Sequence, residues 1–330
     1  MKINLLLITI PLTLTALMSP GCQHLQPNQR DCREDMRQFV QKISAYTQKI
    51  NPDFLIIPQN GQELLTIDGT DTGTPAIAYI KAIHGLGRED LFYGYDGDNI
   101  PTPESVRNRI IPFLNLAESC GIEVLVIDYC STRTFVDNSN LQNTRHGYIS
   151  FVADHRELDN IPAYPPEPHR VNASDITTLK QAQNFLCLIN HGAFRDKTAF
   201  LNALSATNYD LLIIDLFYDT LPLTADEIAR LKTKANGGRR LILSYLSIGE
   251  AEDYRYYWRP EWQQNPPDWL LEQNPDWPGN YRVKYWDPQW QKIIYGNDNS
   301  YVKKILTAGF DGIYLDLIDA FEYFEQHETQ

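Results

Sequence analysis

Eight short apolar segments recur along the chain and alternate with segments of helical periodicity. They lie at residues 54–57, 85–89, 123–127, 148–152, 185–189, 211–214, 241–245 and 312–317. Most are apolar throughout, which is typical of parallel strands that are covered on both faces. Parallel strands require crossover helices, and eight such units can close into a ring. The pattern predicts an α/β protein with a (βα)8 TIM-barrel fold. A doubly wound open sheet is less favoured, because no Gly-rich phosphate turn follows a strand.

The two ends of this pattern are incomplete. Residues 31–50 form an amphipathic helical pattern with no strand before it, and no covering helix is predicted between strand 312–317 and Gln330. Both observations fit a ring of βα units that is opened between a strand and its helix. We therefore expect a circularly permuted barrel, in which strand 313–317 pairs in parallel with strand 54–58 and helix 33–50 covers the seam.

The N-terminus reads as a targeting segment. Lys2 precedes an apolar run over residues 3–18, and Pro11 and the short length argue against a transmembrane helix. The pair Gly21-Cys22 resembles a lipoprotein cleavage site. These features predict a lipoprotein-type signal peptide over residues 1–21, a linker over 22–30 and a single barrel domain over 31–330. The mature protein is expected to be exported, either lipid-anchored through Cys22 to a bacterial membrane or secreted into the periplasm or medium.

Charge and motif content exclude several function classes. The formal net charge of -13 disfavours nucleic-acid binding and suits a neutral or cationic substrate. No His-x-His pair, Walker loop or Gly-x-Ser-x-Gly motif is present, so we expect no metal and no cofactor. Residues 95–99 allow a calcium loop, but a solvated turn is favoured. Four cysteines besides Cys22 allow one disulfide or buried free thiols.

Polar residues gather where the predicted strands end, which is where barrel active sites form. The set comprises Gln59, Asn60, Glu89, Asp90, Asp128, Tyr129, Asp154, Arg156, Asn190, Asp215, Glu250, Asp316 and Asp319. A mouth rich in carboxylates and poor in histidine suits glycoside hydrolysis, which uses one protonated and one ionised carboxyl group. For any single member, a capping or ion-pairing role is the alternative, such as pairing of Glu250 with Arg255.

All six tryptophans fall within residues 258–290, mostly in a segment predicted to be a long aromatic-rich loop over 251–287 on the C-terminal face. Long loops without regular structure are usually functional. Aromatic faces stack on sugar rings, but they also form small cores. We expect most of these rings to hold the loop folded and one or two to face the substrate.

Three motifs carry a resemblance to a known family. They are Tyr-Leu-Ser-Ile-Gly-Glu-Ala-Glu-Asp-Tyr-Arg at 245–255, Asn-Pro-Asp-Trp-Pro-Gly-Asn-Tyr-Arg-Val-Lys-Tyr-Trp at 274–286, and Gly-Phe-Asp-Gly-Ile-Tyr-Leu-Asp at 309–316. The chain resembles the glycoside hydrolase family 114 barrels, the endo-α-1,4-polygalactosaminidase-like proteins. The resemblance covers residues 31–325 in swapped order, which again implies a circular permutation.

The resemblance implies a catalytic pair with Asp316 as nucleophile and Glu89 as acid/base, and Asp90 stays open as the alternative to Glu89. Seven further residues are expected to bind sugar hydroxyls or to tune the pair: Asn60, Asp128, Tyr129, Asp215, Tyr245, Glu250 and Asp319.

The expected function is an exported glycoside hydrolase that cleaves an α-linked amino-sugar polysaccharide of the galactosaminogalactan type, with retention of configuration. The polysaccharide is the only expected partner, and membrane contact is expected only through the lipid anchor. One alternative is a non-catalytic carbohydrate-binding barrel at the cell surface. Another is a barrel enzyme of a different class, such as a lyase or an amidase.

Overall fold

All eight predicted strands are present in the computed structural model, which describes residues 30–327. The predicted signal peptide and most of the predicted linker, including Cys22, lie outside the described residues. The strands are β1 (Leu55–Pro58), β2 (Gly85–Glu89), β3 (Glu123–Tyr129), β4 (Ile149–Ala153), β5 (Leu186–Leu188), β6 (Leu211–Asp215), β9 (Leu241–Ser247) and β13 (Gly312–Asp316).

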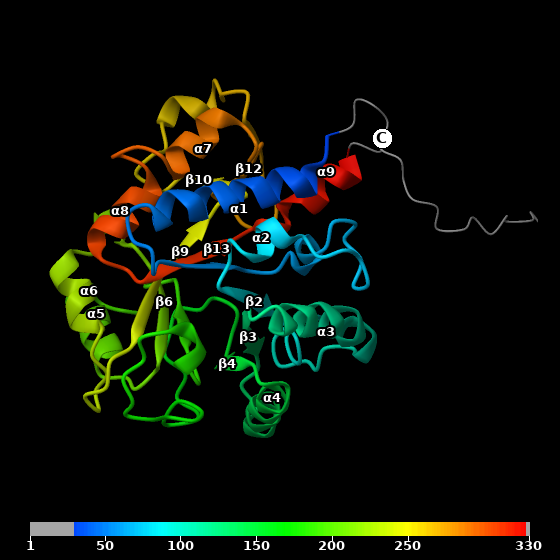
Figure 1. Ribbon diagram of the computed structural model, residues 1–330. Helices are drawn as coiled ribbons and strands as arrows, with labels where there is room; N and C mark the ends of the chain where they lie inside the picture. Colours follow the sequence, from blue (N-terminus) through cyan, green and yellow to red (C-terminus); the bar gives the residue numbers. More distant parts are fainter. Residues whose placement is uncertain (1–29, 328–330) are drawn as a thin grey trace, which may run out of the picture. The chain divides into compact units, whose positions relative to one another are not determined.

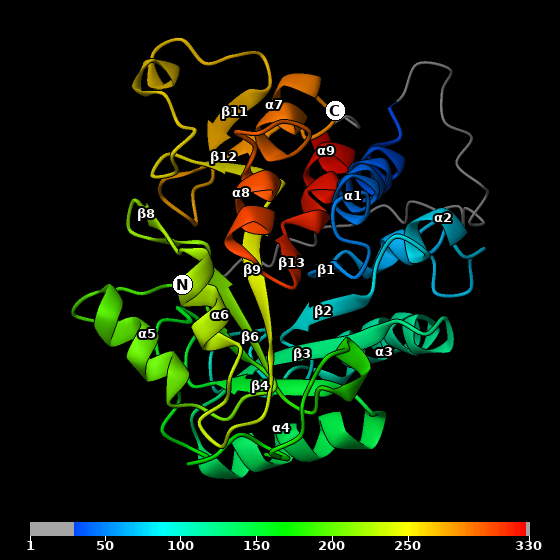
Figure 2. The same ribbon diagram turned by 60° about the vertical axis from the view of Figure 1, so that its left-hand side comes forward.

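These strands form two parallel sheets. One has the order β1-β13-β9-β6-β5, and the other has the order β2-β3-β4. Single parallel bridges join the sheet edges, from Gln59 to Gly87 on one side and from Ser150 to Asn184 on the other. Figure 2 shows β2, β3 and β4 side by side, with β1 next to β2 and β13 on the other side of β1. The protein is therefore an α/β protein built on parallel sheets.

The predicted pairing of the first and last strands is confirmed. β1 and β13 pair in parallel, with Leu55 opposite Gly312 and Pro58 opposite Leu315. A short helix nevertheless follows β13, so the expectation that the last strand has no helix after it was wrong. Helix α9 (Phe321–His327) forms because Phe321 and Phe324 lie one turn apart and are both buried.

Helix α1 (Cys32–Gln48) runs alongside α9, as Figures 1 and 2 show. Arg33 and Glu325 join the two helices, with 2.8 Å between Nε and Oε1. The helix predicted over residues 33–50 thus packs beside the helix that follows the last strand.

The remaining helices are α2 (Ile77–Ile80), α3 (Glu104–Ser119), α4 (Arg133–His146), α5 (Lys197–Ser205), α6 (Ala225–Leu231), α7 (Pro288–Ile294) and α8 (Tyr301–Ala308). A capping box of Thr224 and Glu227 opens α6, which ends at Leu231. A short 3-10 helix, η2 (Leu179–Gln181), is capped by Thr178. The other 3-10 helices are η1 (Gln62–Leu65), η3 (Pro260–Gln263) and η4 (Ile318–Ala320).

The segment 251–287 is not the irregular loop that was predicted. Strands β10 (Glu250–Glu252), β11 (Leu270–Gln273) and β12 (Asn280–Val283) form a three-stranded antiparallel sheet in the order β10-β12-β11. A two-stranded ribbon, β7 (Phe217–Tyr218) with β8 (Leu221–Pro222), follows β6. The short strands and the many turn residues of the segment hid this sheet in the sequence.

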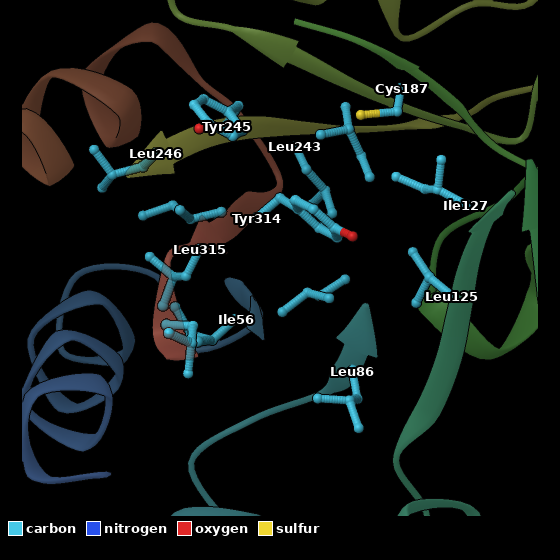
Figure 3. Packing of buried hydrophobic residues seen from close by; sticks show 14 of the residues in the cluster. Ile56, Leu86, Leu125, Ile127, Cys187, Leu243, Tyr245, Leu246, Tyr314 and Leu315 are labelled. Carbon is cyan, nitrogen blue, oxygen red and sulfur yellow. The ribbon is translucent and has the colours of Figure 1, made fainter. Parts of the chain in front are cut away.

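The interior between the parallel strands is filled by side chains. Figure 3 shows the ring of Tyr314 in the middle of this core, with Leu243, Ile127 and Leu86 around it. Gly87 makes room for this ring, because a Cβ atom there would lie 2.1 Å from the Tyr314 hydroxyl oxygen. The core beneath the strand ends is therefore packed rather than open.

The Pro-rich connection over 159–172 is fixed at its end by a buried ion pair. Lys234 and Asp210 are both fully buried, with 2.9 Å between Nζ and Oδ1. Asn172 donates to Asp210 at 2.9 Å, and its carbonyl oxygen accepts from Lys234 at 2.9 Å. These bonds tie the connection to the start of β6 and to the turn after α6.

Two further findings apply to residues 30–327. No disulfide joins Cys32, Cys120, Cys130 and Cys187 to one another. No helix in this part of the chain is long and apolar enough to cross a membrane.

Candidate active site

A cavity of about 660 Å³ lies at the C-terminal ends of the parallel strands. Eight of the nine predicted catalytic and substrate-binding residues line it: Asn60, Glu89, Tyr129, Asp215, Tyr245, Glu250, Asp316 and Asp319. They converge because the carboxyl ends of parallel strands meet on one face. The positions of the strand ends therefore explain why most of these residues line one cavity.

Asp128 is the predicted site residue that does not line the cavity. It is completely buried, and its two carboxylate oxygens accept from the backbone of Phe92 at 2.8 Å and from the hydroxyl of Ser139 at 2.6 Å. Successive side chains of a strand point to opposite faces, so Tyr129 faces the cavity while Asp128 points to α4. The placement gives Asp128 a structural task, which is to fix the loop after β2 against α4.

Asp316 is the last residue of β13, and the protein holds its carboxylate firmly. The hydroxyl of Tyr245 donates to Oδ2 at 2.6 Å, and the backbone N–H of Leu317 donates to Oδ1 at 2.7 Å. Burial, and then the charge of Glu89, raise the pKa of Asp316 to about 7. These two donors lower the pKa without outweighing burial.

Glu89 is the last residue of β2 and is held from two neighbouring strands. The hydroxyl of Tyr129 donates to Oε1, and the side-chain amide of Asn60 donates to Oε2 at 3.4 Å. Asn60 also accepts from the backbone N–H of Glu89 at 3.3 Å. The Glu89 carboxylate is thereby turned into the cavity.

Asp90, the alternative to Glu89, does not line the cavity. Its carboxylate pairs with the guanidinium of Arg156, with 3.1 Å between Oδ1 and an Nη atom. Burial raises the pKa of Asp90 to about 6, although the bond from Arg156 opposes this shift. Of the two neighbours, Glu89 is the one that presents its carboxylate to the cavity.

Arg156 connects this side of the site. Its guanidinium lies 4.4 Å from the centre of the Tyr129 ring and also pairs with Asp98, at 3.3 Å between Nε and Oδ1. Arg156 thus covers the tyrosine that donates to Glu89. Asp98 belongs to the turn that was weighed as a calcium loop, and no group of three or more potential metal-binding side chains occurs among residues 30–327.

The opposite side of the site contains a buried ion cluster that sequence reasoning placed differently. Arg255 was considered as a partner of Glu250, but it pairs with Asp215 at 2.6 Å and with Glu252. Glu250 instead accepts from the side chain of Asn274 at 2.8 Å. Burial raises the pKa values of Asp215 and Glu250, while Arg255 and Asn274 respectively oppose the shifts.

Several residues of the cavity were not among the predicted site residues. They are Cys187, His191, Asp219, Glu252, Tyr254, Arg255 and Trp277. The sequence offered a reason to predict two of them. His191 directly follows Asn190 just after β5, and Glu252 lies two positions after Glu250 in a strand, so that both side chains point to the same face. Trp277 gave no signal that separated it from the other tryptophans, because their spacing does not follow one regular period.

Comparison with known proteins connects this site to a family. Residues 167–330 match the model of glycoside hydrolase family GH114. This part of the chain carries β5 to β13 and with them Asp215, Glu250 and Asp316. This part of the chain, just under half of it, is therefore similar to a glycoside hydrolase family.

The curated relatives are uncharacterized proteins. The chain is 39% identical to one from Methanocaldococcus jannaschii over 184 residues. This stretch is 54% of this chain and 50% of the relative. It is 34% identical to one from Thermotoga maritima, over 46% of each chain, and 42% identical to one from Deinococcus radiodurans, over 37% of each chain. The chain spans half the length or less of these relatives.

Proposed function

We propose that this protein is a glycoside hydrolase that uses Asp316 and Glu89 as its catalytic pair. One observation carries the proposal. Asp316 is the last residue of β13 and Glu89 is the last residue of β2, and both carboxylates face the same cavity. Hydrogen-bond donors of the protein orient each of them. Glycosidases need two such carboxyl groups on either side of the scissile bond.

In the proposed mechanism, the Asp316 carboxylate attacks the anomeric carbon while Glu89 gives its proton to the leaving glycosidic oxygen. The carbon–oxygen bond to the leaving group breaks, and a glycosyl ester forms on Asp316. Water then attacks the same carbon, Glu89 takes the proton of that water, and Asp316 is released as a carboxylate. The configuration is retained because two inversions occur.

The raised pKa of Asp316 bears on this division of roles. Burial and the charge of Glu89 raise that pKa to about 7, so Asp316 is partly protonated near neutral pH. A nucleophile has to be ionised when it attacks the anomeric carbon. The proposed mechanism therefore uses the ionised form of Asp316, to which Tyr245 and the Leu317 N–H donate hydrogen bonds.

The proposed substrate is an α-linked amino-sugar polysaccharide of the galactosaminogalactan type. The family resemblance suggests this class, and the formal net charge of -13 is compatible with a cationic polymer. We propose that the protein is exported and that Cys22 carries a lipid, as the N-terminal sequence suggests.

We also propose that the parallel strands form one closed, circularly permuted (βα)8 barrel. The two single bridges at the sheet edges and the pairing of β1 with β13 support a continuous ring of eight strands. In the permutation, α1 replaces the long crossover helix that would otherwise follow β13.

Substitution of either carboxylate tests the proposal. Asp316→Asn and Glu89→Gln are each expected to lower kcat on an α-1,4-galactosamine polymer by a factor of roughly 100 or more, because each removes one chemical step. Glu261→Gln, an exposed position in η3, serves as the control and is expected to keep full activity. Unchanged thermal unfolding of the variants would show that the loss is chemical.

The first product formed reports the stereochemistry. NMR of the reducing end during early hydrolysis is expected to show the α-anomer before mutarotation. An initial β-anomer would replace the retaining mechanism with an inverting one. If the wild-type protein binds such polymers and cleaves none of them, the carbohydrate-binding alternative holds instead.

A further inference from the structure

One tryptophan differs from the other five in its surroundings. Trp277 is 54% exposed. The others pack against aromatic neighbours, with ring centres 4.8 Å apart for Trp258 and Tyr281, 5.1 Å for Trp262 and Trp269, 5.2 Å for Trp269 and Trp290, and 4.6 Å for Trp286 and Phe324. These five hold the β10–β12–β11 region folded, whereas Trp277 presents its ring surface to solvent.

Trp277 lies in the turn between β11 and β12, and this turn borders the cavity. Trp277, Pro278 and Asn280 all line it. β12 pairs with β10, which places Asn280 opposite Glu252, and β10 begins directly after β9 ends. In Figure 2 the β11 and β12 strands lie beside α7, beyond the end of β9. The turn therefore extends the cavity beyond the ends of the parallel strands.

The turn is fixed rather than loose. The side chain of Asn274 donates to Glu250 at 2.8 Å, and the backbone N–H of Asp253 donates to the carbonyl of Gly279 at 2.9 Å. Gly279 has a φ of 94°, a conformation that favours glycine and allows the chain to reverse here. Trp277 is thus presented at a defined place on the cavity wall.

A second exposed aromatic ring lies on the same side. Tyr254 is 58% exposed and lines the cavity, while its hydroxyl donates to Glu252 at 2.7 Å. Two exposed rings next to polar side chains, here Asn280 and Glu250, provide the contacts that a sugar ring uses: an apolar face to stack on and groups that bind its hydroxyls.

We infer that Trp277 is the platform of a further sugar subsite, which binds a ring of the same polysaccharide beyond the two units that the scissile bond joins at the catalytic pair. The inference rests on the proposed function. In strand order the subsite lies on the β9 side of Asp316, whereas Glu89 lies on the other side, beyond β1. A substrate that fills both places must contain at least three units, so the enzyme should act on longer chains more efficiently than on disaccharides.

Chain-length dependence tests the subsite. With α-1,4-galactosamine hexasaccharide, Trp277→Ala is expected to lower kcat/KM about tenfold, mainly through KM, because the stacking surface is lost. Trp277→Phe keeps a ring and should recover much of that loss. Binding to the Asp316→Asn protein should show the same loss for the hexasaccharide and none for the disaccharide. Tyr95→Ala removes an exposed aromatic outside the cavity and is the control for general surface effects.

The outcomes separate the two proposals. If the wild-type protein cleaves the hexasaccharide and Trp277→Ala has the same kcat/KM, the subsite is overturned. The proposed catalytic pair would not be affected by that result. Equal losses on the disaccharide and the hexasaccharide, with a lowered unfolding temperature, would give Trp277 a structural role and also overturn the subsite. A wild-type protein that neither binds nor cleaves these saccharides would overturn the proposed substrate and the subsite together.

Discussion

At the scale of single residues, the end of β13 brings two partly buried carboxyl groups close together. Asp316 and Asp319 lie within one turn of each other, and burial raises both pKa values to about 7, with a further contribution from neighbouring carboxylates. Leu317 has a φ of 58°, a left-handed conformation that lets its N–H reach back to Asp316. This short segment therefore gives up stability to keep two acids in a defined place.

Replacing Asp319 tests how much folding stability its partly buried carboxyl group costs when it is ionised. The pKa of an aspartate in the unfolded chain is about 3.9, and the pKa of Asp319 in the fold is about 7. The folded state therefore binds this proton more tightly, and the resulting stability is present below pH ~4 and lost as the pH rises through about 7. Asn cannot ionise, so Asp319→Asn should unfold at a higher temperature than the wild type at pH 8 and at a similar temperature at pH 4.

Thermal unfolding at both pH values measures this effect, with the exposed Asp298→Asn as the control that should change neither temperature. A variant that is less stable than the wild type at pH 8 would mean that the Asp319 carboxylate stabilises the fold in its charged form.

At the scale of the elements, the sequence predicted the strands far better than it predicted the helices and the small sheet. The strands are continuous apolar runs, which need no partner to be recognised. Helix α4 was missed because its buried face is mostly polar, with Ser139, Asn140 and Asn143 directed inward beside Val136. Such a face has no apolar periodicity, and its partners, such as Asp128, come from a distant strand.

The same reason limits the prediction of the site. The positions of the strand ends are enough to bring Asp316, Glu89 and Asp215 to one face, because parallel strands end on the same side. The sequence did not determine which cation pairs with which carboxylate, since Arg255 reaches Asp215 only when β6 and β9 are adjacent. Partner choice of this kind depends on tertiary packing and not on local spacing.

The close fit of β13 between its neighbours provides a test at this scale. A Cβ atom at Gly312 would lie 2.5 Å from the carbonyl oxygen of Leu55 in β1 and 2.7 Å from the Leu243 side chain in β9. Gly312→Ala should therefore destabilise the fold by about 1–3 kcal/mol or more, because the backbone of β1 has to move.

Denaturant unfolding measures that change. Gly192→Ala is the matched control, since nothing lies within 4 Å of the position that its Cβ would take, and its effect should stay within about 0.5 kcal/mol. Equal stability of the two variants would show that β1 and β13 can separate without cost.

At the scale of the whole molecule, the proposed export and the proposed activity depend on each other, because a polysaccharide outside the cell is reached only by an exported enzyme. Expression with residues 1–29 in a bacterial host, followed by mass spectrometry of the mature N-terminus, checks this. We expect Cys22 as the first residue, carrying acyl chains. A mature protein that begins at another residue, or whose Cys22 is unmodified, would contradict the lipid anchor. The export proposal would then depend on whether the protein is found outside the cytoplasm of the host.

The pairing of β1 with β13 also limits when the strands can pair during synthesis of the chain. Arg33 and Glu325, which join the helices beside this pair, are 292 residues apart in the chain. During synthesis, β1 is among the first strands made, yet its hydrogen-bonding neighbour is made last of all the described strands. Contacts of such separation form slowly, and unpaired strand edges invite aggregation in the meantime. The edge of β1 that pairs with β13 therefore stays unpaired until the last described strand has been made.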